Sequence, residues 1–161
     1  MKTGLVIPAV IFQEMMGHAM GDAQNEVCGI LAGYVTGYVT GQFAGELSRQ
    51  LPGQGNQNLV QRIFPGENAD RSAVSYELDP RQQLRIEKEL KKEGMEMLAI
   101  YHSHPGGQAF PSAKDVLLAV WDVVYIIIGL PGDKKQKPQV RAFRVYGEKT
   151  KTVKEVLLRI V

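Results

Sequence analysis

Apolar and polar residues alternate along this 161-residue chain in blocks that predict a mixed α/β domain. Helices are expected over residues 8–21 and 79–93 and from Ser112 to about Trp121, because their apolar spacing, Pro starts and Gly ends are typical of helices. The apolar face of the first helix comprises Val10, Ile11, Met15 and Ala19. Short apolar and β-branched runs predict strands, at 27–33, 59–64, 97–101, 123–128 and 139–146, while 152–160 fits either a strand or a helix.

The length fits a single domain over residues 1–161, which can bury about two thirds of its unfolded surface. Strands and helices alternate without the glycine fingerprint of dinucleotide-binding proteins, so we expect a central sheet, either largely antiparallel or mixed, flanked by helices. Residues 34–58 depart from this pattern. They are rich in Gly, Gln and Asn and include most of a tandem Gly-Tyr-Val-Thr repeat. A flexible insertion or hairpin loop is expected there.

Composition and charge exclude several classes of partner. The 19 basic and 17 acidic residues give a net charge of +2, too small to indicate nucleic-acid binding. The single cysteine, Cys28, excludes an internal disulfide framework and a cysteine-rich metal cluster, and it fits a reducing compartment. The apolar runs at 5–12 and 116–130 are too short or too interrupted for a signal peptide or a membrane span. We therefore expect a cytoplasmic protein without nucleic-acid or membrane partners.

The most chemically specific feature is the His-Ser-His-Pro run over residues 102–105, which ends a predicted strand. Residues i and i+2 of a strand face the same side, so the His102 and His104 imidazoles converge, with Cα atoms roughly 6.5 Å apart. Asp115, eleven residues after His104, completes a three-ligand set for a divalent metal. Three protein ligands leave one tetrahedral position for water, as in catalytic zinc sites.

These residues also have purely structural interpretations. A His-x-His pair alone is a weak signal, and Ser112-x-x-Asp115 before an apolar run is typical of a helix capping box. The two roles are compatible, since Ser112 can cap the helix while Asp115 reaches a metal. Glu26 is the best candidate for the base of a hydrolytic site, although a glutamate beside Asn25 is typical of a solvated loop. His18 has no partner in the pattern and is interpreted as incidental.

Three separated segments together resemble the JAMM, or MPN+, metalloprotease family. They are Glu-Val-Cys-Gly-Ile-Leu at 26–31, His-Ser-His-Pro at 102–105 and Pro-Ser-Ala-Lys-Asp at 111–115, which agree with its signature in order, identity and spacing. Tyr-Glu-Leu-Asp-Pro at 76–80 resembles the small stand-alone prokaryotic members. The resemblance covers nearly the whole chain except about 34–58. It implies a single MPN/JAMM-like domain of the α/β (α+β) class with a cytidine-deaminase-like architecture.

Carried over position by position, the resemblance implies one Zn2+ ion with three ligands, His102, His104 and Asp115. Glu26 would hold the attacking water and act as general base, and then pass the proton to the leaving amine. Ser112 would stabilise the tetrahedral oxyanion. The family has a cysteine at the position of Cys28 without a catalytic role, so we expect that residue to pack as a small apolar side chain.

The resemblance also implies a class of substrate. Members of the family hydrolyse peptide or isopeptide bonds after the C-terminal Gly-Gly of ubiquitin-like proteins, and the small prokaryotic members resemble enzymes that process ubiquitin-like sulfur carriers. The expected partner is therefore a ubiquitin-like or sulfur-carrier protein with a Gly-Gly tail. Such a tail can add as a strand at a sheet edge. Residues 34–58 are either a flap over that groove or an unconstrained insertion, and the oligomeric state is open, a homodimer included.

Two other functions compete with a protease. A zinc nucleoside deaminase needs His-x-Glu and Pro-Cys-x-x-Cys, and a chain with Cys28 as its single cysteine lacks that set. A non-catalytic MPN-type metal-binding scaffold for protein partners is the alternative. The presence of Glu26 and Ser112 favours the enzyme, because a scaffold has no use for either residue.

Overall fold

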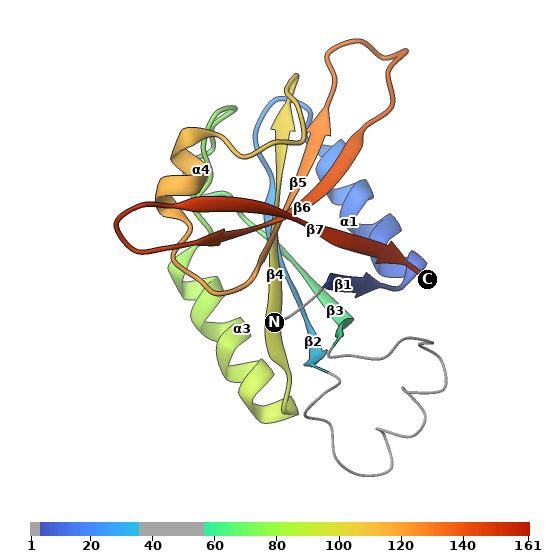
Figure 1. The fold of residues 1–161 in the computed structure, drawn as a ribbon. Coiled ribbons are helices and arrows are strands. Elements are labelled where there is room, and N and C mark those ends of the chain that lie inside the picture. The colour runs from blue at the N-terminus through green and yellow to red at the C-terminus, as the bar shows by residue number, and fades with distance from the viewer. Residues whose placement is uncertain (1–3, 36–56) are drawn as a thin grey trace.

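The computed structural model describes residues 4–35 and 57–161, drawn in colour in Figure 1. The expected insertion at 34–58 therefore lies outside the described residues except for residues 34, 35, 57 and 58, of which all but Gln57 belong to strands. The elements in chain order are β1 (Gly4–Ile7), α1 (Ala9–Gly21), β2 (Cys28–Val35), β3 (Asn58–Gly66), α3 (Pro80–Glu93), β4 (Glu96–Pro105), α4 (Ala113–Leu118), β5 (Val124–Leu130), β6 (Gln139–Tyr146) and β7 (Thr152–Ile160).

The seven described strands form one mixed sheet that closes into a barrel in the order β1-β3-β2-β4-β5-β6-β7. The β1–β3, β1–β7 and β4–β5 pairs are parallel and the other pairs are antiparallel. The mixed sheet expected from the sequence is thus confirmed, and residues 152–160 form a strand. Closure was not predicted, because it depends on β1, a strand of only four residues that bridges β3 and β7. The cytidine-deaminase-like architecture stays a prediction.

Helices α1 and α3 pack against opposite faces of β2. Successive strand residues point to opposite faces, and Leu31 belongs to the barrel core that α1 joins while Ile30 packs with α3. Helix α1 contributes Ile11, Met15 and Ala19 to that core. The prediction for Val10 was wrong, since its side chain is 70% exposed. Val10 lies about 100° around the helix from the buried i, i+4, i+8 stripe.

Helix α3 begins and ends where the sequence predicts. The Asp79 side chain caps it by accepting hydrogen bonds from the backbone N–H groups of Arg81 and Gln82, at 2.8 and 3.0 Å. Gly94 ends the helix with a φ of +67°, the left-handed conformation that glycine adopts without strain. Its buried residues Ile86 and Leu90 cover the outer face of β2.

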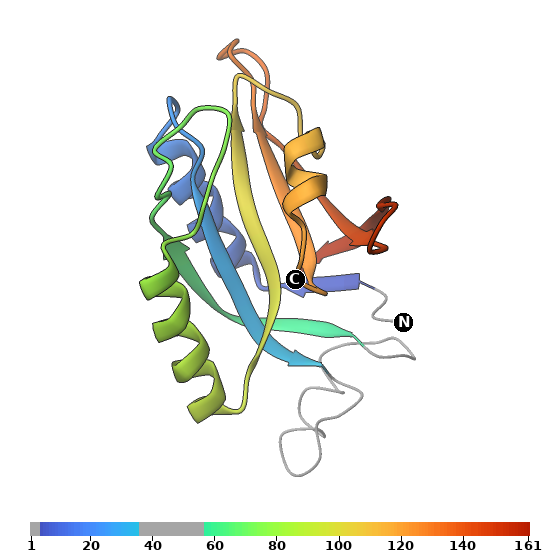
Figure 2. The same ribbon diagram turned by 90° about the vertical axis from the view of Figure 1, so that its left-hand side faces the viewer.

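Helix α4 is shorter than expected and lies beside the C-terminal half of β4 in both views (Figures 1 and 2). The expected end at Trp121 was wrong, because the helix stops at Leu118. The Tyr125 hydroxyl accepts a hydrogen bond from the Trp121 N–H at 3.0 Å and donates one to its carbonyl at 3.1 Å, so those backbone groups are satisfied outside a helix. Among the described residues, no helix is long and apolar enough to cross a membrane.

Candidate metal centre

His102 and His104 lie on one face at the C-terminal end of β4, as the strand periodicity predicts. Strand β4 is held on both sides, and His102 pairs with Cys28 of β2 and with Ile127 of β5. His102 is fully buried and His104 is partly exposed. Their Nε2 atoms are 3.0 Å apart. Two ring nitrogens from neighbouring positions therefore face a common point at the end of the strand.

The start of α4 brings a carboxylate to the same point. Ser112 and Asp115 form a capping box in which Ser112 Oγ accepts from the Asp115 N–H at 3.1 Å and Asp115 Oδ2 accepts from the Ser112 N–H at 2.7 Å. The capping interpretation is confirmed. The same Asp115 Oδ2 lies 3.2 Å from His104 Nε2 and 3.4 Å from His102 Nε2. Gly106, with a φ of +65°, makes the turn that returns the chain from β4 toward α4.

The three side-chain atoms form a nearly regular triangle with sides of 3.0, 3.2 and 3.4 Å. Tetrahedral ligands at zinc bond lengths of about 2.0–2.1 Å are separated from one another by about 3.3 Å. Two imidazole nitrogens and one carboxylate oxygen are also a donor set that zinc accepts. The residues present therefore fit a zinc ion with one coordination position left over.

The electrostatic environment suits His102 and Asp115 as ligands, whereas the contact of His104 with Asp115 outweighs burial and raises the pKa of His104. Burial lowers the pKa of His102, despite the neighbouring carboxylate, which favours a neutral imidazole with a free lone pair. Burial acts against ionisation of Asp115 too, but its close contacts with the His102 and His104 imidazoles outweigh burial and hold the pKa of this carboxyl well below its usual range. His104 Nδ1 lies 2.9 Å from the Gln108 carbonyl oxygen and donates to it, which leaves Nε2 as the free nitrogen.

Glu26 lies beside this triangle and is buried, with 4% of its surface exposed. The solvated-loop interpretation is therefore wrong. Glu26 Oε1 is 3.9 Å from His104 Nε2, and the carboxylate accepts no hydrogen bond from any described residue. Burial raises the pKa of Glu26 to about 7, with His104 opposing the change and the Asp115 charge adding to it. A carboxylate with this pKa is suited to exchange protons near neutral pH.

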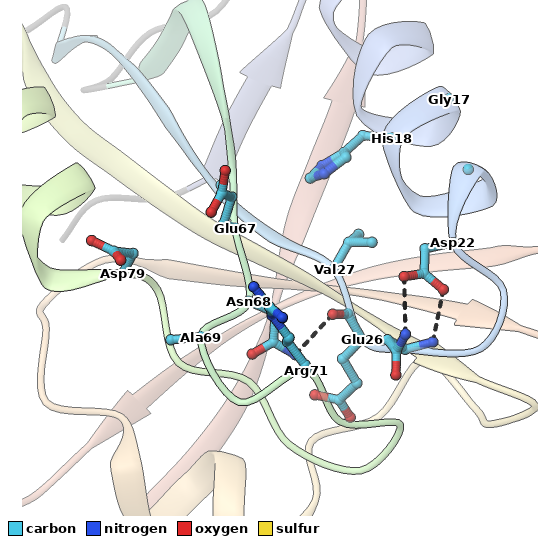
Figure 3. A pocket seen from close by; sticks show the side chains of 13 residues that line it. Gly17, His18, Asp22, Glu26, Val27, Glu67, Asn68, Ala69, Arg71 and Asp79 are labelled. Carbon is cyan, nitrogen blue, oxygen red and sulfur yellow. Dashed lines mark hydrogen bonds between the residues drawn. The ribbon is translucent and has the colours of Figure 1, made fainter.

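Two cavities adjoin these residues. One, of about 1080 Å3, lies between α1 and residues 66–71 and includes Glu26 in its lining. In Figure 3 the Glu26 side chain extends away from His18 and Glu67, which line other parts of this cavity. The second, of about 480 Å3, is lined by Asp115 together with apolar and aromatic side chains of β4, α4 and the loop before α3. The candidate site is therefore bordered by open space on two sides.

The structure adds one aromatic contact that the sequence analysis missed. The Tyr76 ring stacks on His102 at a centroid distance of 4.3 Å and an interplanar angle of 24°. Tyr76 comes from the loop between β3 and α3, 26 residues before His102, and no periodicity links the two positions. The only sequence signal was its place in the Tyr-Glu-Leu-Asp-Pro run, to which we assigned no role.

The remaining polar candidates have structural partners. His18 Nδ1 lies 2.7 Å from the Tyr101 hydroxyl, so the incidental histidine takes part in a helix-to-strand contact. Cys28 is fully buried, and burial raises the pKa of its thiol to about 12. A thiol with so high a pKa is protonated at neutral pH and is neither a good nucleophile nor a metal ligand. This supports packing as the role of Cys28.

Comparison with known proteins places this geometry in a family. The model of the prokaryotic homologs of the JAB domain matches residues 8–146. The chain is 40% identical over 101 residues to a probable TtuB-protein conjugate cleaving protease of Thermus thermophilus, covering 59% of this chain and 64% of that protein. It is 32% identical over 82 residues to the desampylase of Pyrococcus furiosus, and this match covers 50% of this chain and 59% of that protein. The matched regions span about three fifths of these relatives.

Comparison with solved structures shows that the similarity extends over nearly the whole chain. The solution structure of protein DSY2949 from Desulfitobacterium hafniense matches 98% of this chain and 94% of its own, with a TM-score of 0.72 and 30% identity. A protein from Salinibacter ruber, at 20% identity and a TM-score of 0.57, shares the fold. The match over residues 8–146 includes all the candidate site residues. The resemblance drawn from the sequence is thus confirmed, and the chain belongs to the prokaryotic homologs of the JAB domain.

Proposed function

We propose that this protein is a zinc-dependent metallo(iso)peptidase that hydrolyses the bond after the C-terminal Gly-Gly of a ubiquitin-like or sulfur-carrier protein. One observation carries the proposal: a triangle of ligand atoms with zinc-like spacing lies beside a buried glutamate whose pKa is close to 7. Membership of the family and the names of its relatives, which refer to TtuB conjugates and to desampylation, support it.

His102, His104 and Asp115 would hold the ion. The chemistry that zinc supplies at such a site is Lewis acidity, which lowers the pKa of a bound water to about 7 and polarises the scissile carbonyl. The buried position of His102 and the hydrogen bond from His104 Nδ1 to Gln108 fix both rings before the ion arrives. Preorganised ligands of this kind bind a metal without having to move.

Glu26 would act as the general base and then as the general acid. Its carboxylate accepts the proton of the attacking water and delivers it to the leaving amine, so one group serves both halves of the reaction. Burial raises its pKa to about 7, which lets the group bind and release a proton at neutral pH. The Glu26 Oε1 atom lies 3.9 Å from His104 Nε2, beside the proposed ligands, and this supports a role for Glu26 as base and not as ligand.

Ser112 would donate a hydrogen bond to the oxyanion of the tetrahedral intermediate. Its oxygen already accepts from the Asp115 N–H, which leaves the hydroxyl proton available as a donor. Ser112 is exposed and is the N-cap residue of the helix that carries Asp115. A single donor of this kind is worth about 3 kcal/mol of transition-state stabilisation.

The Gly-Gly tail would lie in the cavity of about 480 Å3 that Asp115 lines. Addition at a sheet edge, as expected from the sequence, receives no support, because the described strands close into a barrel. The cavity combines apolar walls, such as Ile100 and Trp121, with polar groups such as Lys114. Glycine residues have no side chains and suit a narrow approach to the scissile bond.

The proposal is tested with two fusions of a ubiquitin-like protein ending in Gly-Gly, one joined to a reporter peptide through its α-amine and one through a lysine ε-amine. Wild type should cleave at least one of them, and a fusion ending in Ala-Ala should stay intact. Glu26→Ala should keep one zinc per chain and lose at least about 100-fold in kcat. Glu87→Ala, the same change on an exposed part of α3, should leave kcat unchanged. A wild-type protein that binds zinc and cleaves neither fusion would favour the non-catalytic scaffold.

A further inference from the structure

The backbone around Glu26 is held at three points by residues distant in sequence. The Glu26 N–H donates to the Ser72 carbonyl at 2.8 Å, and the Glu26 carbonyl accepts from Asn68 Nδ2 at 2.9 Å. The next amide, of Val27, donates to Ser103 Oγ at 2.9 Å. Because the Glu26 carboxylate accepts no hydrogen bond from any described residue, these backbone anchors and side-chain packing are what fix its position.

The side chain of Asn68, in the loop between β3 and α3, makes several hydrogen bonds. Its Nδ2 group donates to the carbonyls of Glu26 and Ser75, each at 2.9 Å, and its Oδ1 atom accepts from the N–H groups of Asp70 and Glu77 at 3.0 and 3.1 Å. Two donors and two acceptor sites are the whole capacity of an asparagine amide. Both carbonyls face the nitrogen and both N–H groups face the oxygen, so the orientation of the amide is fixed.

We propose that Asn68 is a positioning residue for Glu26, an inference that rests on the proposed role of Glu26 as general base. An asparagine that only shaped a turn would need the bonds within its own loop. One Asn68 bond leaves that loop and ends on the Glu26 carbonyl, 42 residues away in sequence. A shift of about 1 Å in a catalytic group can cost about 100-fold in rate, and no other side chain bonds to that carbonyl among the described residues.

Asn68 also connects Glu26 with the aromatic contact at the metal ligands. It binds the carbonyl of Ser75, the residue directly before Tyr76, and the Tyr76 ring stacks on His102. One amide thus joins the backbone of the proposed base to the loop that covers a proposed ligand. The metal ligands themselves make no hydrogen bond to Asn68 among the described residues, so its loss should disturb Glu26 more than metal binding.

The test compares Asn68→Asp with wild type. Aspartate keeps the shape of the side chain and the two bonds accepted by Oδ1, and it loses both donated bonds. Val74→Ala is the matched control, because it shortens a side chain of the same loop that is 79% exposed and lines neither cavity of the candidate site. Asn68→Ala, which adds no charge, is assayed beside it, so that the comparison holds even if the aspartate variant does not fold. Each protein is assayed for kcat and KM on the Gly-Gly fusions, for zinc affinity, and for hydrogen exchange at the Glu26 amide.

We expect Asn68→Asp to lower kcat by about 10- to 100-fold while KM and zinc affinity stay within about threefold, and Val74→Ala to match wild type. Exchange of the Glu26 amide should accelerate at least about tenfold in the Asn68 variants alone. Wild-type kcat in both Asn68 variants overturns the proposal, and so does a loss of zinc affinity as large as the loss of kcat. If wild type cleaves neither fusion, the proposed function fails, and unchanged exchange at Glu26 would separately overturn the anchoring by Asn68.

Discussion

Glu26→Gln should stabilise the metal-free protein at neutral and alkaline pH while abolishing cleavage. The Glu26 carboxyl is buried, accepts no hydrogen bond from the described residues and has its pKa raised from 4.5 to about 7 by burial. Ionising it in the folded protein is therefore costly, whereas a glutamine at this position carries no charge at any pH. Residues that an enzyme needs for activity often lower its folding stability, and Glu26 is expected to do the same.

Proton linkage gives the sign and the size of the difference in unfolding free energy between Glu26→Gln and wild type. Between pH 4.5 and about 7 the folded protein holds the Glu26 proton more tightly than the unfolded chain, so stability falls as the pH rises and is constant above that window. A pKa difference of about 2.5, at about 1.4 kcal/mol per pKa unit, corresponds to about 3 kcal/mol. The variant should therefore match wild type near pH 4.5 and exceed it by about 3 kcal/mol at pH 8.

The assay is urea unfolding followed by circular dichroism in EDTA at several pH values from 4.5 to 8.5. Chelation is needed because a bound cation beside Glu26 would stabilise its charged form. Glu87→Gln, on an exposed part of α3, is the control and should show no pH-dependent difference from wild type. A gap between Glu26→Gln and wild type that does not grow with pH, or a variant less stable at pH 8, would refute the reasoning.

Three further predictions concern the residues around the site. Tyr76→Leu should weaken zinc binding about tenfold in a competition titration with a chelator, because it removes the ring stacked on His102, and unchanged affinity would count against that role. Gly29→Ala should cost about 1–3 kcal/mol in urea unfolding, since the added Cβ would overlap the ring of buried Tyr101, and an unchanged unfolding free energy would contradict the packing. Cys28→Ala should keep kcat within about twofold of wild type, whereas a large loss of kcat would show a chemical role for the thiol.

The parts of the site that follow local rules could be read from the sequence. His102 and His104 converge because side chains two residues apart in a strand point to the same face. Ser112 and Asp115 have the residue types and the spacing of a capping box. Both signals depend on residues at most three positions apart. The ends of α3 were predictable for the same reason, since a capping aspartate and a left-handed glycine act within one helical turn.

The features of the site and the fold that depend on contacts between distant segments could not be predicted from local sequence patterns. Glu26 follows polar residues that are typical of a loop, and its burial depends on a loop more than 40 positions further along the chain. The stacking of Tyr76 and the early end of α4 at the Tyr125 hydroxyl are likewise contacts between separate elements. Barrel closure depends on β1, whose four residues carry no pattern strong enough to indicate two partners.

The central claim is that one zinc ion held by His102, His104 and Asp115 drives hydrolysis after Gly-Gly. The most direct measurement titrates zinc into chelator-stripped protein while cleavage of the Gly-Gly fusions is followed and bound metal is counted. Activity should be absent without metal, rise in proportion to bound zinc and level off at one ion per chain, with no recovery in Asp115→Ala. Full activity in EDTA, or no cleavage from protein that holds one zinc ion, would contradict it.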